Sequence, residues 1–440
     1  MKHTIFIIMI FMSSLTLKAQ DTIVLNIEQC REMALQSSYD LQRGDNAIRQ
    51  AKLTRKAMTT NYFPQAEGAA MVFSTKDISM IESSMGNIDM VMQGAYMCGL
   101  VLTQPLFAGG KIVTGHKLTK VGVEAAEETQ RMQRAKTIAK VESTYWTYVA
   151  VLSKVKLLED YKNSLEILCE QTDNSVMAGM ATNYDQMQVR AAHSNIIYQL
   201  KRAQSGASLC RMSLCQMTGI NYDSVYLVPD TTIVAVTAPS NLIADISNRP
   251  EVQLLNLHLK ANELQVKMTR GDYLPKLALA LGYTWIGNTK VKGGLTLPQF
   301  GNIPIDKSID IDLPSVMLTL SVPITKWWEG SYNIKKAKLE VENSRLDMEN
   351  NKELLQLEVR QAIFNLEESY QLIETAKIAF DAASEQLRVA QNRYDVNVAP
   401  LFDLLDAQNK WQQAKSDYIE AKTQFLIYKV EYERVTGILE

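Results

Sequence analysis

Two segments near the C-terminal end of the chain carry apolar residues at alternating intervals of three and four positions. In the first segment these residues are Ile373, Ala376, Phe380, Ala383, Leu387, Ala390 and Tyr394. In the second they are Leu404, Ala407, Trp411, Ala414, Tyr418, Ala421, Phe425, Tyr428, Tyr432 and Val435. The average interval of about 3.5 residues is the period of a coiled-coil seam. Because large residues alternate with alanine along much of both seams, the pattern predicts two helices in close antiparallel contact.

A short loop near Asn397, Val398, Ala399 and Pro400 separates the two segments. Pro400 suits the first turn of the following helix, and Ala399 before it is disfavoured in helical geometry. The sequence therefore predicts a long helical hairpin with a sharp tip.

The chain also repeats itself at a displacement of 218 residues. The shift superimposes Leu102 on Leu320, Pro105 on Pro323, Asp185 on Asp403, and Thr218-Gly219-Ile220 on Thr436-Gly437-Ile438. One offset that persists from residue 102 to residue 220 indicates two copies of one unit. We therefore predict a first repeat at residues 20–220, a connector at 221–247 that forms a small belt, and a second repeat at 248–440.

Each predicted repeat begins with a helix, at about residues 27–60 and about 249–271, and each helix ends before a proline. Two strands follow, at about 65–74 and 96–106 in the first repeat and about 275–286 and 315–325 in the second. A loop from about Gly287 to Pro314 separates the last two strands. Helical hairpins then occupy about 111–218 and 331–437, and the tip of the first hairpin lies at about 178–182.

The predicted strands have one aliphatic face and one face of small or polar residues. In the strand from Pro275 the aliphatic face consists of Leu277, Leu279, Leu281, Tyr283 and Trp285. Such strands of about ten residues are typical of the lipid-facing wall of a β-barrel, although one sheet of a soluble sandwich has the same period. Tyr283, Trp285, Trp327 and Trp328 are candidate anchors at the membrane interface. Packing at the junction between barrel and helices would explain Trp327 and Trp328 equally.

Composition and charge narrow the class of protein. The chain has 440 residues, 46% hydrophobic and 21% charged, and its net charge of −2 gives no reason to expect a nucleic-acid partner. Residues 1–19 place Lys2 before the apolar run Ile5–Met12 and end in Ala19, which predicts a signal peptide. No later stretch has 18 uninterrupted apolar residues, so the sequence predicts an exported chain without a transmembrane helix. The five scattered cysteines argue against a disulfide framework.

Four predicted strands per chain are too few to close a barrel. An open sheet in lipid would leave two edges of unpaired backbone N–H and C=O groups, each at a cost of several kcal/mol. Three chains would supply about twelve strands, an even number within the range of outer-membrane barrels. The strand count alone leaves two or four copies open.

The run Gln104-Pro105-Leu106-Phe107-Ala108-Gly109-Gly110-Lys111 strongly resembles the TolC family of outer-membrane efflux channels, in which such a run leads from the β-barrel into the long helix. The second copy, from Val322 to Gly330, is weaker and has two extra residues before its glycine. The paired Thr-Gly-Ile runs and the segment Asp403–Gln408 resemble the family too. The junction residues that the resemblance implies are Gln104, Pro105, Leu106, Phe107, Gly109, Gly110, Pro323 and Gly330.

The resemblance implies a mainly α-helical, internally duplicated protomer with a membrane β-barrel. Three protomers would form a twelve-stranded barrel in the outer membrane and an α-helical barrel in the periplasm. The channel would be a passive duct of a tripartite efflux system, without enzymatic activity or a cofactor. Its partners would be a periplasmic adaptor (membrane fusion) protein, an inner-membrane efflux pump and outer-membrane lipid. The exit channel of a type I protein secretion system and a periplasmic coiled-coil scaffold without a pore are alternatives.

The resemblance also implies a gate at the periplasmic end. Asp403 and Asp406 match an acidic ring, Asp185 matches the gate aspartate of the first copy, and Tyr394 matches a gate tyrosine. Asp403 and Asp406 share a helix face, and three copies would concentrate carboxylates around one axis, which repels anions and attracts cations. Favourable interaction with the helix N-terminal dipole is the alternative role for Asp185 and Asp403.

The pattern departs from the family at two positions of the second tip. Ala399 stands where a gate arginine is frequent, and Asn397 stands where glycine is usual. A gate locked by an arginine–aspartate pair at Ala399 is therefore not expected.

A predicted extracellular loop between the first two strands is rich in methionine: Met80, Met85, Met90, Met92 and Met97. Thioethers can bind Cu(I), but flexible apolar loop residues are the simpler interpretation. The histidines form no cluster with ligand spacing, so the sequence predicts no metal site.

Overall fold

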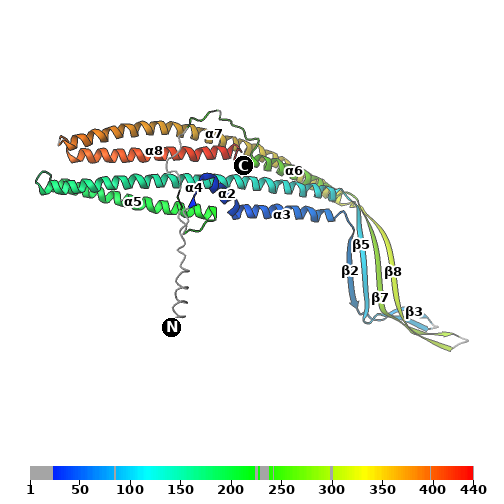
Figure 1. Ribbon diagram of the computed structural model, residues 1–440. Coiled ribbons are helices and arrows are strands. Elements are labelled where there is room, and N and C mark those ends of the chain that lie inside the picture. Colours follow the sequence, from blue (N-terminus) through cyan, green and yellow to red (C-terminus); the bar gives the residue numbers. More distant parts are fainter. Residues whose placement is uncertain are drawn as a thin grey trace, which may run out of the picture. The chain divides into compact units, whose positions relative to one another are not determined.

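The computed structural model describes residues 23–83, 86–222, 226–227, 237–240, 242–297, 301–396 and 398–439 (Figure 1). The predicted signal peptide at residues 1–19 lies outside these residues, as do Met85, Asn397 and part of the predicted connector. The chain forms two compact units. Unit 1 comprises Met1–Asn46, Glu127–Leu254 and Glu349–Glu440, and unit 2 comprises Ala47–Ala126 and Leu255–Met348. Each unit draws on both predicted repeats, and the division into repeats stays a prediction.

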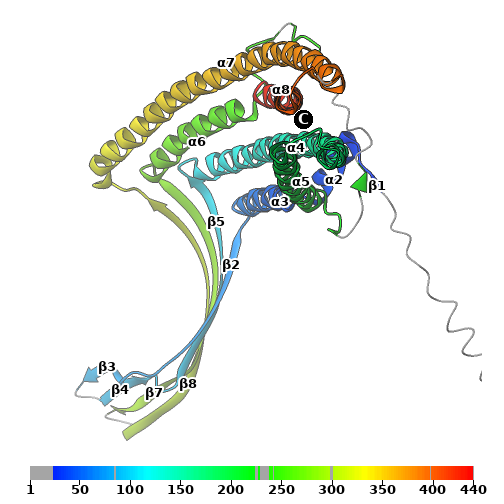
Figure 2. The same ribbon diagram turned by 90° about the vertical axis from the view of Figure 1, so that its left-hand side faces the viewer.

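Unit 2 contains an antiparallel sheet whose strands come from both predicted repeats (Figure 2). Its strands are β2 (Gln65–Phe73), β3 (Ile78–Ser83), β4 (Gly86–Val91), β5 (Ala95–Ala108), β7 (Lys276–Leu297) and β8 (Gly301–Ser321). β7 pairs with β8 on one side, while its other side pairs first with β5 and then with β4. β2 lies beside β5, and β3 lies beside β4.

The register places the aliphatic positions of neighbouring strands side by side. Leu281 of β7 lies between Leu102 of β5 and Val316 of β8. Tyr283 likewise pairs with Leu100 on one side. Because side chains alternate between the two faces of a strand, the strands share one continuous aliphatic face, as the alternation predicts.

The predicted loop from Gly287 to Pro314 is wrong. β7 continues to Leu297 and β8 begins at Gly301, and the two strands stay paired except at an irregularity between Ile286 and Thr289. Glycine, asparagine and proline are loop signals, but Asn288 has a φ of 60° at this irregularity, as in a β-bulge. Pro304 and Pro314 lie on β8, an edge strand of the sheet, where a proline is tolerated.

Other predicted boundaries also shift. The strand predicted at 315–325 ends at Ser321, and the helix predicted from 331 begins at Lys326. Met80 and Met90 lie on β3 and β4, and Met97 lies on β5, so the methionine-rich segment is largely strand rather than loop. The first helix is interrupted at Ser38, whose ψ of 116° is extended.

Seven helices occupy the described part of the chain. They are α2 (Ile27–Ser37), α3 (Tyr39–Thr60), α4 (Lys111–Met177), α5 (Asn183–Thr218), α6 (Pro250–Asp272), α7 (Lys326–Asp395) and α8 (Leu401–Val435). With 67 and 70 residues, α4 and α7 are each about 100 Å long at the rise of an α-helix. None of the helices in these residues combines the length and apolar character needed to cross a membrane.

The repeated Thr-Gly-Ile runs end two helices in the same way. Gly219 after α5 and Gly437 after α8 have φ values of 72° and 71°, a left-handed conformation that glycine adopts without steric cost. The N–H of Ile220 donates to the carbonyl of Cys215, and that of Ile438 donates to the carbonyl of Glu433. These bonds satisfy carbonyl groups that a helix end leaves free.

In unit 1, α7 and α8 pack along the predicted seam. Ile373, Phe425, Tyr432 and Val435 lie in one buried cluster, which confirms these seam positions. The ring of Phe380 stacks on that of Tyr418, with centroids 5.9 Å apart. There a large residue faces another large residue, although the alternation predicts alanine.

Candidate gate at the hairpin tips

One apolar cluster in unit 1 joins the hairpins α4–α5 and α7–α8 near their tips. Its buried members are Leu158, Tyr161, Leu165 and Leu168 of α4, Val189, Ile196 and Leu200 of α5, and Leu401, Leu404 and Leu405 of α8. Leu387 and Tyr394 of α7 pack against the cluster. The Tyr161 hydroxyl donates to Asn409 Oδ1 at 3.1 Å, and the Lys154 ammonium lies 2.8 Å from a Glu420 carboxylate oxygen. Both hairpins therefore form one packed body at this end.

Asp185 is held by its own helix. Its carboxylate accepts from the Thr182 N–H at 3.0 Å and from the Thr182 hydroxyl at 2.7 Å, while the Asp185 N–H donates to Thr182 Oγ1 at 3.2 Å. This is a reciprocal cap of the first turn of α5. The geometry supports the helix-terminal role that the sequence leaves open for Asp185.

The second tip is built differently. Pro400 precedes α8 without a side-chain cap, and the exposed Asp403 lies in the first turn, where a carboxylate favours the helix dipole. Asp406 Oδ2 lies 2.6 Å from Lys410 Nζ, one turn further along α8. The acidic charge of Asp406 is thus partly balanced within its own helix.

The predicted gate residues divide between the two hairpins. Tyr394 is brought to the apolar cluster that contains Leu401 and Leu404, whereas the Asp185 carboxylate is engaged at its own helix start. Asp403 and Asp406 lie on successive turns of α8 beside that cluster. A constriction formed by these four residues stays a prediction.

A polar link at the first tip was missed by sequence reasoning. Asp173 of α4 accepts from Gln186 at 2.8 Å and lies 3.1 Å from an Arg190 guanidinium nitrogen, so it joins α4 to α5. The hydrogen bonds from Gln186 and then Arg190 hold the pKa of Asp173 below its ordinary value. The sequence signal for this link was the pair of opposite charges, Asp173 before and Arg190 after the predicted tip at 178–182.

The junction motif makes a compact turn in unit 2. Gly109 and Gly110 have φ values of 63° and 75°, and a Cβ on Gly109 would lie 2.3 Å from the Gly271 carbonyl oxygen. Gln104 donates to the Tyr62 carbonyl at 3.3 Å. Glycine is therefore required where the chain leaves β5 for α4.

The remaining junction residues have less uniform surroundings. Pro105 lies at a register shift between β5 and β7, Leu106 and Phe107 are exposed, and Pro323 lies between β8 and α7. Gly330 is buried in α7, where a Cβ would lie 2.6 Å from the Tyr273 ring.

The candidate interface aromatics make contacts of two kinds. Trp327 Nε1 donates to the Tyr273 carbonyl at 3.0 Å, which supports the junction role. Trp328 is 79% exposed. On the aliphatic face, Trp285 packs edge-on against Tyr96 with centroids 5.3 Å apart, and Tyr283 is exposed.

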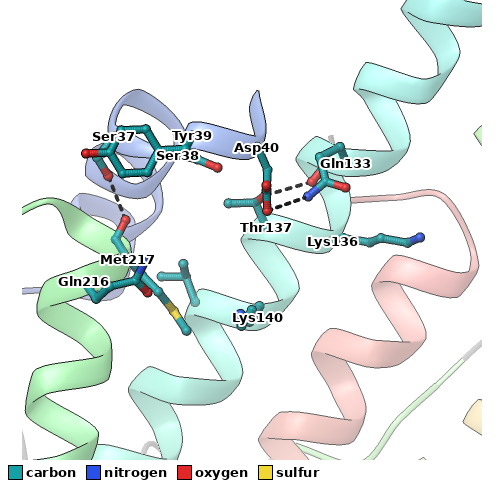
Figure 3. A pocket seen from close by; sticks show the side chains of 11 residues that line it. Ser37, Ser38, Tyr39, Asp40, Gln133, Lys136, Thr137, Lys140, Gln216 and Met217 are labelled. Atoms are coloured by element: carbon teal, nitrogen blue, oxygen red, sulfur yellow. Dashed lines mark hydrogen bonds between the residues drawn. The ribbon is translucent and has the colours of Figure 1, made fainter. Parts of the chain in front are cut away.

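The break at Ser38 borders a hollow of about 300 Å³ between α2–α3, α4 and α5 (Figure 3). The Ser37 hydroxyl donates to the Met217 carbonyl at 2.7 Å, and Gln133 donates to Asp40 at 3.5 Å. These bonds tie both sides of the break to the first hairpin. The polar run at residues 37–40 was the sequence signal for the interruption.

Known proteins with similar sequence and fold agree with this architecture. The sequence model of the family described as "Outer membrane efflux protein" matches residues 30–219 and again residues 244–437. The outer membrane protein TolC of Escherichia coli (strain K12) is 20% identical over 352 residues, covering 79% of this chain and 71% of TolC. The alkaline protease secretion protein AprF of Pseudomonas aeruginosa is also 20% identical, covering 79% of this chain and 70% of AprF. The Campylobacter jejuni CmeC outer membrane channel has the same fold, with a TM-score of 0.74, 19% identity, and coverage of 93% of this chain and 85% of CmeC.

The two family matches together span most of the chain, and each contains one helical hairpin. The two matched segments include the long helices, the strands with one aliphatic face, and the Gly109–Gly110 turn between β5 and α4. This chain is an outer-membrane efflux channel rather than an enzyme, and it belongs to the family of outer membrane efflux proteins.

Proposed function

We propose that three copies of this chain form a passive duct through the outer membrane, with their hairpins forming a tube in the periplasm. The observation that carries this proposal is the sheet of unit 2. Its aliphatic face is continuous across β5, β7 and β8 and continues on β2 with Ala66, Gly68, Ala70 and Val72. Among the described residues, β2 and β8 each pair with a strand on one side only, which leaves their other edges open. Such edges are unfavourable in lipid unless another strand pairs with them. Pairing β8 of one copy with β2 of the next would give about twelve strands.

The assembly is tested with protein extracted from outer membranes. We expect a detergent-requiring trimer that dissociates only on heating, and single-channel conductance in planar bilayers. A monomer that stays dispersed without detergent would instead support the scaffold alternative and contradict the duct.

The proposed partners are a periplasmic adaptor and an inner-membrane pump. A groove of about 610 Å³ between α7 and α8 supports this proposal, because small residues such as Ala376, Ala379 and Ala414 line it and would let an adaptor helix approach closely. Replacing Ala414 with Trp should reduce adaptor capture by purified trimers. Equal capture would place the adaptor elsewhere.

The proposed gate consists of Asp403, Asp406, Asp185 and Tyr394. Asp403 and Asp406 would supply the acidic ring, Tyr394 would join it to the apolar cluster, and Asp185 would fix the start of α5 beside it. Asp403→Ala with Asp406→Ala should raise conductance or reduce cation preference and block by multivalent cations. Asp417→Ala, further along the exposed side of α8, is the matched control. Unchanged selectivity and cation block would remove these aspartates from the constriction.

A second candidate within transport is the exit channel of a type I protein secretion system. The similarity to the alkaline protease secretion protein AprF favours it. Co-expression with a cognate exporter distinguishes the two: secretion of a whole protein that depends on this chain supports the second candidate, whereas drug sensitivity of a deletion strain supports the first.

We also propose that Trp285, Tyr283 and Trp328 lie at the membrane interface. Their amphipathic rings suit the headgroup region, and Tyr283 and Trp328 are exposed. Quenching of Trp328 fluorescence by lipids brominated near the headgroup would support this placement, and absence of quenching would contradict it.

A further inference from the structure

Strand β8 exchanges the polarity of its two faces halfway along its length. We call the part of the sheet that carries the continuous aliphatic face the wall. On that face of β8, Leu320, Leu318 and Val316 are followed by Asp312, Asp310, Ser308 and Asp306. On the opposite face, Thr319, Met317 and Ser315 are followed by Leu313, Ile311, Ile309, Ile305 and Ile303. Since successive side chains alternate between faces, the apolar side of the sheet changes near residue 313.

The exchange is not produced by an irregularity in β8 itself. Between the pairs Ile286–Ile311 and Thr289–Ile309, β7 advances by three residues while β8 advances by two. The additional residue therefore belongs to β7, where Asn288 has its positive φ. The faces of β8 can be followed without interruption from Ser321 to Gly301.

The hairpin β3–β4 continues the new pattern. We define the distal sheet as β3, β4, residues 289–297 of β7 and residues 301–313 of β8 (Figure 2). The face of Ile303 and Ile309 also carries Ile78, Ile88, Met90, Val291 and Leu295. Lys307 interrupts this face, and its long stem allows the ammonium group to reach the rim.

The opposite face of the distal sheet suits water. Lys292 of β7 lies between Asp89 of β4 and Asp306 of β8 in the register, an arrangement in which opposite charges on neighbouring strands attract. Ser79 and Ser308 share this face. The two faces of the distal sheet therefore have the reverse polarity of the two faces of the wall: the side that is aliphatic in the wall is polar in the distal sheet.

The orientation of the wall decides which side of the barrel the apolar face of the distal sheet occupies. If the aliphatic side of the wall faces lipid, the side of Thr319 and Ser315 faces the lumen, and the distal apolar face continues that lumen side. In the single chain, Leu313, Ile303 and Ile309 are 48%, 43% and 39% exposed. In a symmetric ring, the molecules that face this side across the axis are the other copies of the same chain.

We propose that the distal sheets of three copies pack their apolar faces against one another over the channel axis, forming an apolar constriction on the extracellular side. This inference rests on the trimeric duct proposed above. A pore lined by aliphatic side chains resists wetting, so the constriction would limit passage of water and ions until the sheets separate.

Cysteine labelling on intact cells tests the proposal, with a membrane-impermeant maleimide as the probe. Ile309→Cys lies on the apolar face, and Ser308→Cys, its neighbour on the polar face, is the matched control. Ile303→Cys with Asn302→Cys is a second pair in case the first expresses poorly. The unaltered chain gives the background from its native cysteines. We expect Ile309→Cys to react at least about tenfold more slowly than Ser308→Cys, as for a site that reacts only when packed elements open.

The outcomes separate this inference from the proposed duct. Equal labelling in trimers that conduct in bilayers would overturn the constriction and leave the duct intact, whereas absence of trimers or of conductance would overturn the duct itself. If Ile309→Cys is protected from the maleimide on cells but not in purified, conducting trimers, another molecule covers the apolar face on cells. That result would also overturn the constriction.

Conductance provides an independent measurement. Ile309→Asp places a charge in the proposed constriction and should raise single-channel conductance at least about twofold by wetting it. Ser308→Asp adds the same charge to the polar face and should leave conductance unchanged. Equal conductance of the two variants would contradict the proposal.

Discussion

Arg31 and Arg249 are related by the 218-residue displacement, and each pairs with a glutamate on a long helix of unit 1. Arg31 of α2 pairs with Glu142 of α4, and Arg249, immediately before α6, pairs with Glu358 of α7 at 2.7 Å. Burial is reversed between the pairs. Glu142 is 2% exposed and Arg31 39%, whereas Arg249 is 1% exposed and Glu358 37%. The same position of the duplicated sequence thus places the buried charge on opposite partners.

The two glutamates differ in the guanidinium groups that engage them. Glu358 accepts from Arg434 of α8 as well as from Arg249, so two guanidinium groups share one carboxylate. Near Arg31, a second acidic residue, Glu433 of α8, lies close enough to interact with both Arg31 and Glu142. Arg249 also pairs with Glu251, and Arg434 also pairs with Glu431, so the second site is a network of two arginines and three glutamates. At the first site the buried Glu142 is paired with Arg31.

The largest expected effect comes from removing Arg31. Arg31→Met leaves the buried Glu142 without this guanidinium, and breaking a buried ion pair costs about 3–5 kcal/mol of unfolding free energy. Urea titration of the protein in detergent, followed by circular dichroism, measures the loss. Lys154→Ala removes an exposed ion pair with Glu420 and should cost at most about 1 kcal/mol. Similar losses for both variants would mean that burial of Glu142 does not decide the energy.

Removing Arg249 should cost less, although Arg249 is itself the more buried arginine. Arg249→Met leaves Glu358 with Arg434 at 2.7 Å, so the loss is about 1.5–3 kcal/mol, the range for one hydrogen bond to a charged group. Combining it with Arg434→Met should cost more than the two single changes together, because the last guanidinium then disappears. Strict additivity would show that the two arginines do not share Glu358.

These ion pairs lie beyond what the sequence could predict. Arg31 and Glu142 are far apart in the chain, and neither stands out within its own helix. Their contact depends on the rotation of α2 about its axis relative to α4, and the 3.5-residue period contains no information about that rotation. The period did predict α7 and α8, because burial of one helix face repeats at short range. The 218-residue displacement then extended the prediction to α4 and α5.

The strands show the same limit on a smaller scale. Alternation revealed the aliphatic positions from Leu277 to Trp285, but Gly287 and Asn288 ended the prediction because they are ordinary loop residues. In the structure one irregularity absorbs them, and pairing resumes at Thr289. At the hairpin tips, the acidic residues were evident in the sequence, but the cap that engages Asp185 depends on the backbone geometry at Thr182.

Opposite pH dependence would sharpen the comparison of the two sites. Burial alone would raise the pKa of Glu358, but hydrogen bonds from Arg249 and Arg434 outweigh it and hold the pKa below the ordinary 4.5. The stabilisation from Glu358 is therefore fully present above pH 4.5 and is lost as the pH falls through the lower folded-state value. Glu358→Gln should destabilise the protein at neutral pH, and the difference should shrink on acidification. A difference that stays constant with pH would contradict the charge-based account.

The smallest effect is expected at Glu433, with the opposite sign. Burial first, and then the Glu142 charge, raise the pKa of Glu433 above its ordinary 4.5 despite opposing effects of Lys429 and Arg31. Because the folded state holds this proton more tightly, the contribution of Glu433 is most favourable below pH 4.5 and is lost as the pH rises through the folded-state value. Glu433→Gln, which keeps the side chain uncharged, should therefore increase stability at neutral pH and change little in acid. Unfolding curves of Glu433→Gln and Glu358→Gln at neutral and at acidic pH provide the matched measurement. A shift of the same sign for both variants would show that the two sites do not differ in how burial and charge act on their glutamates.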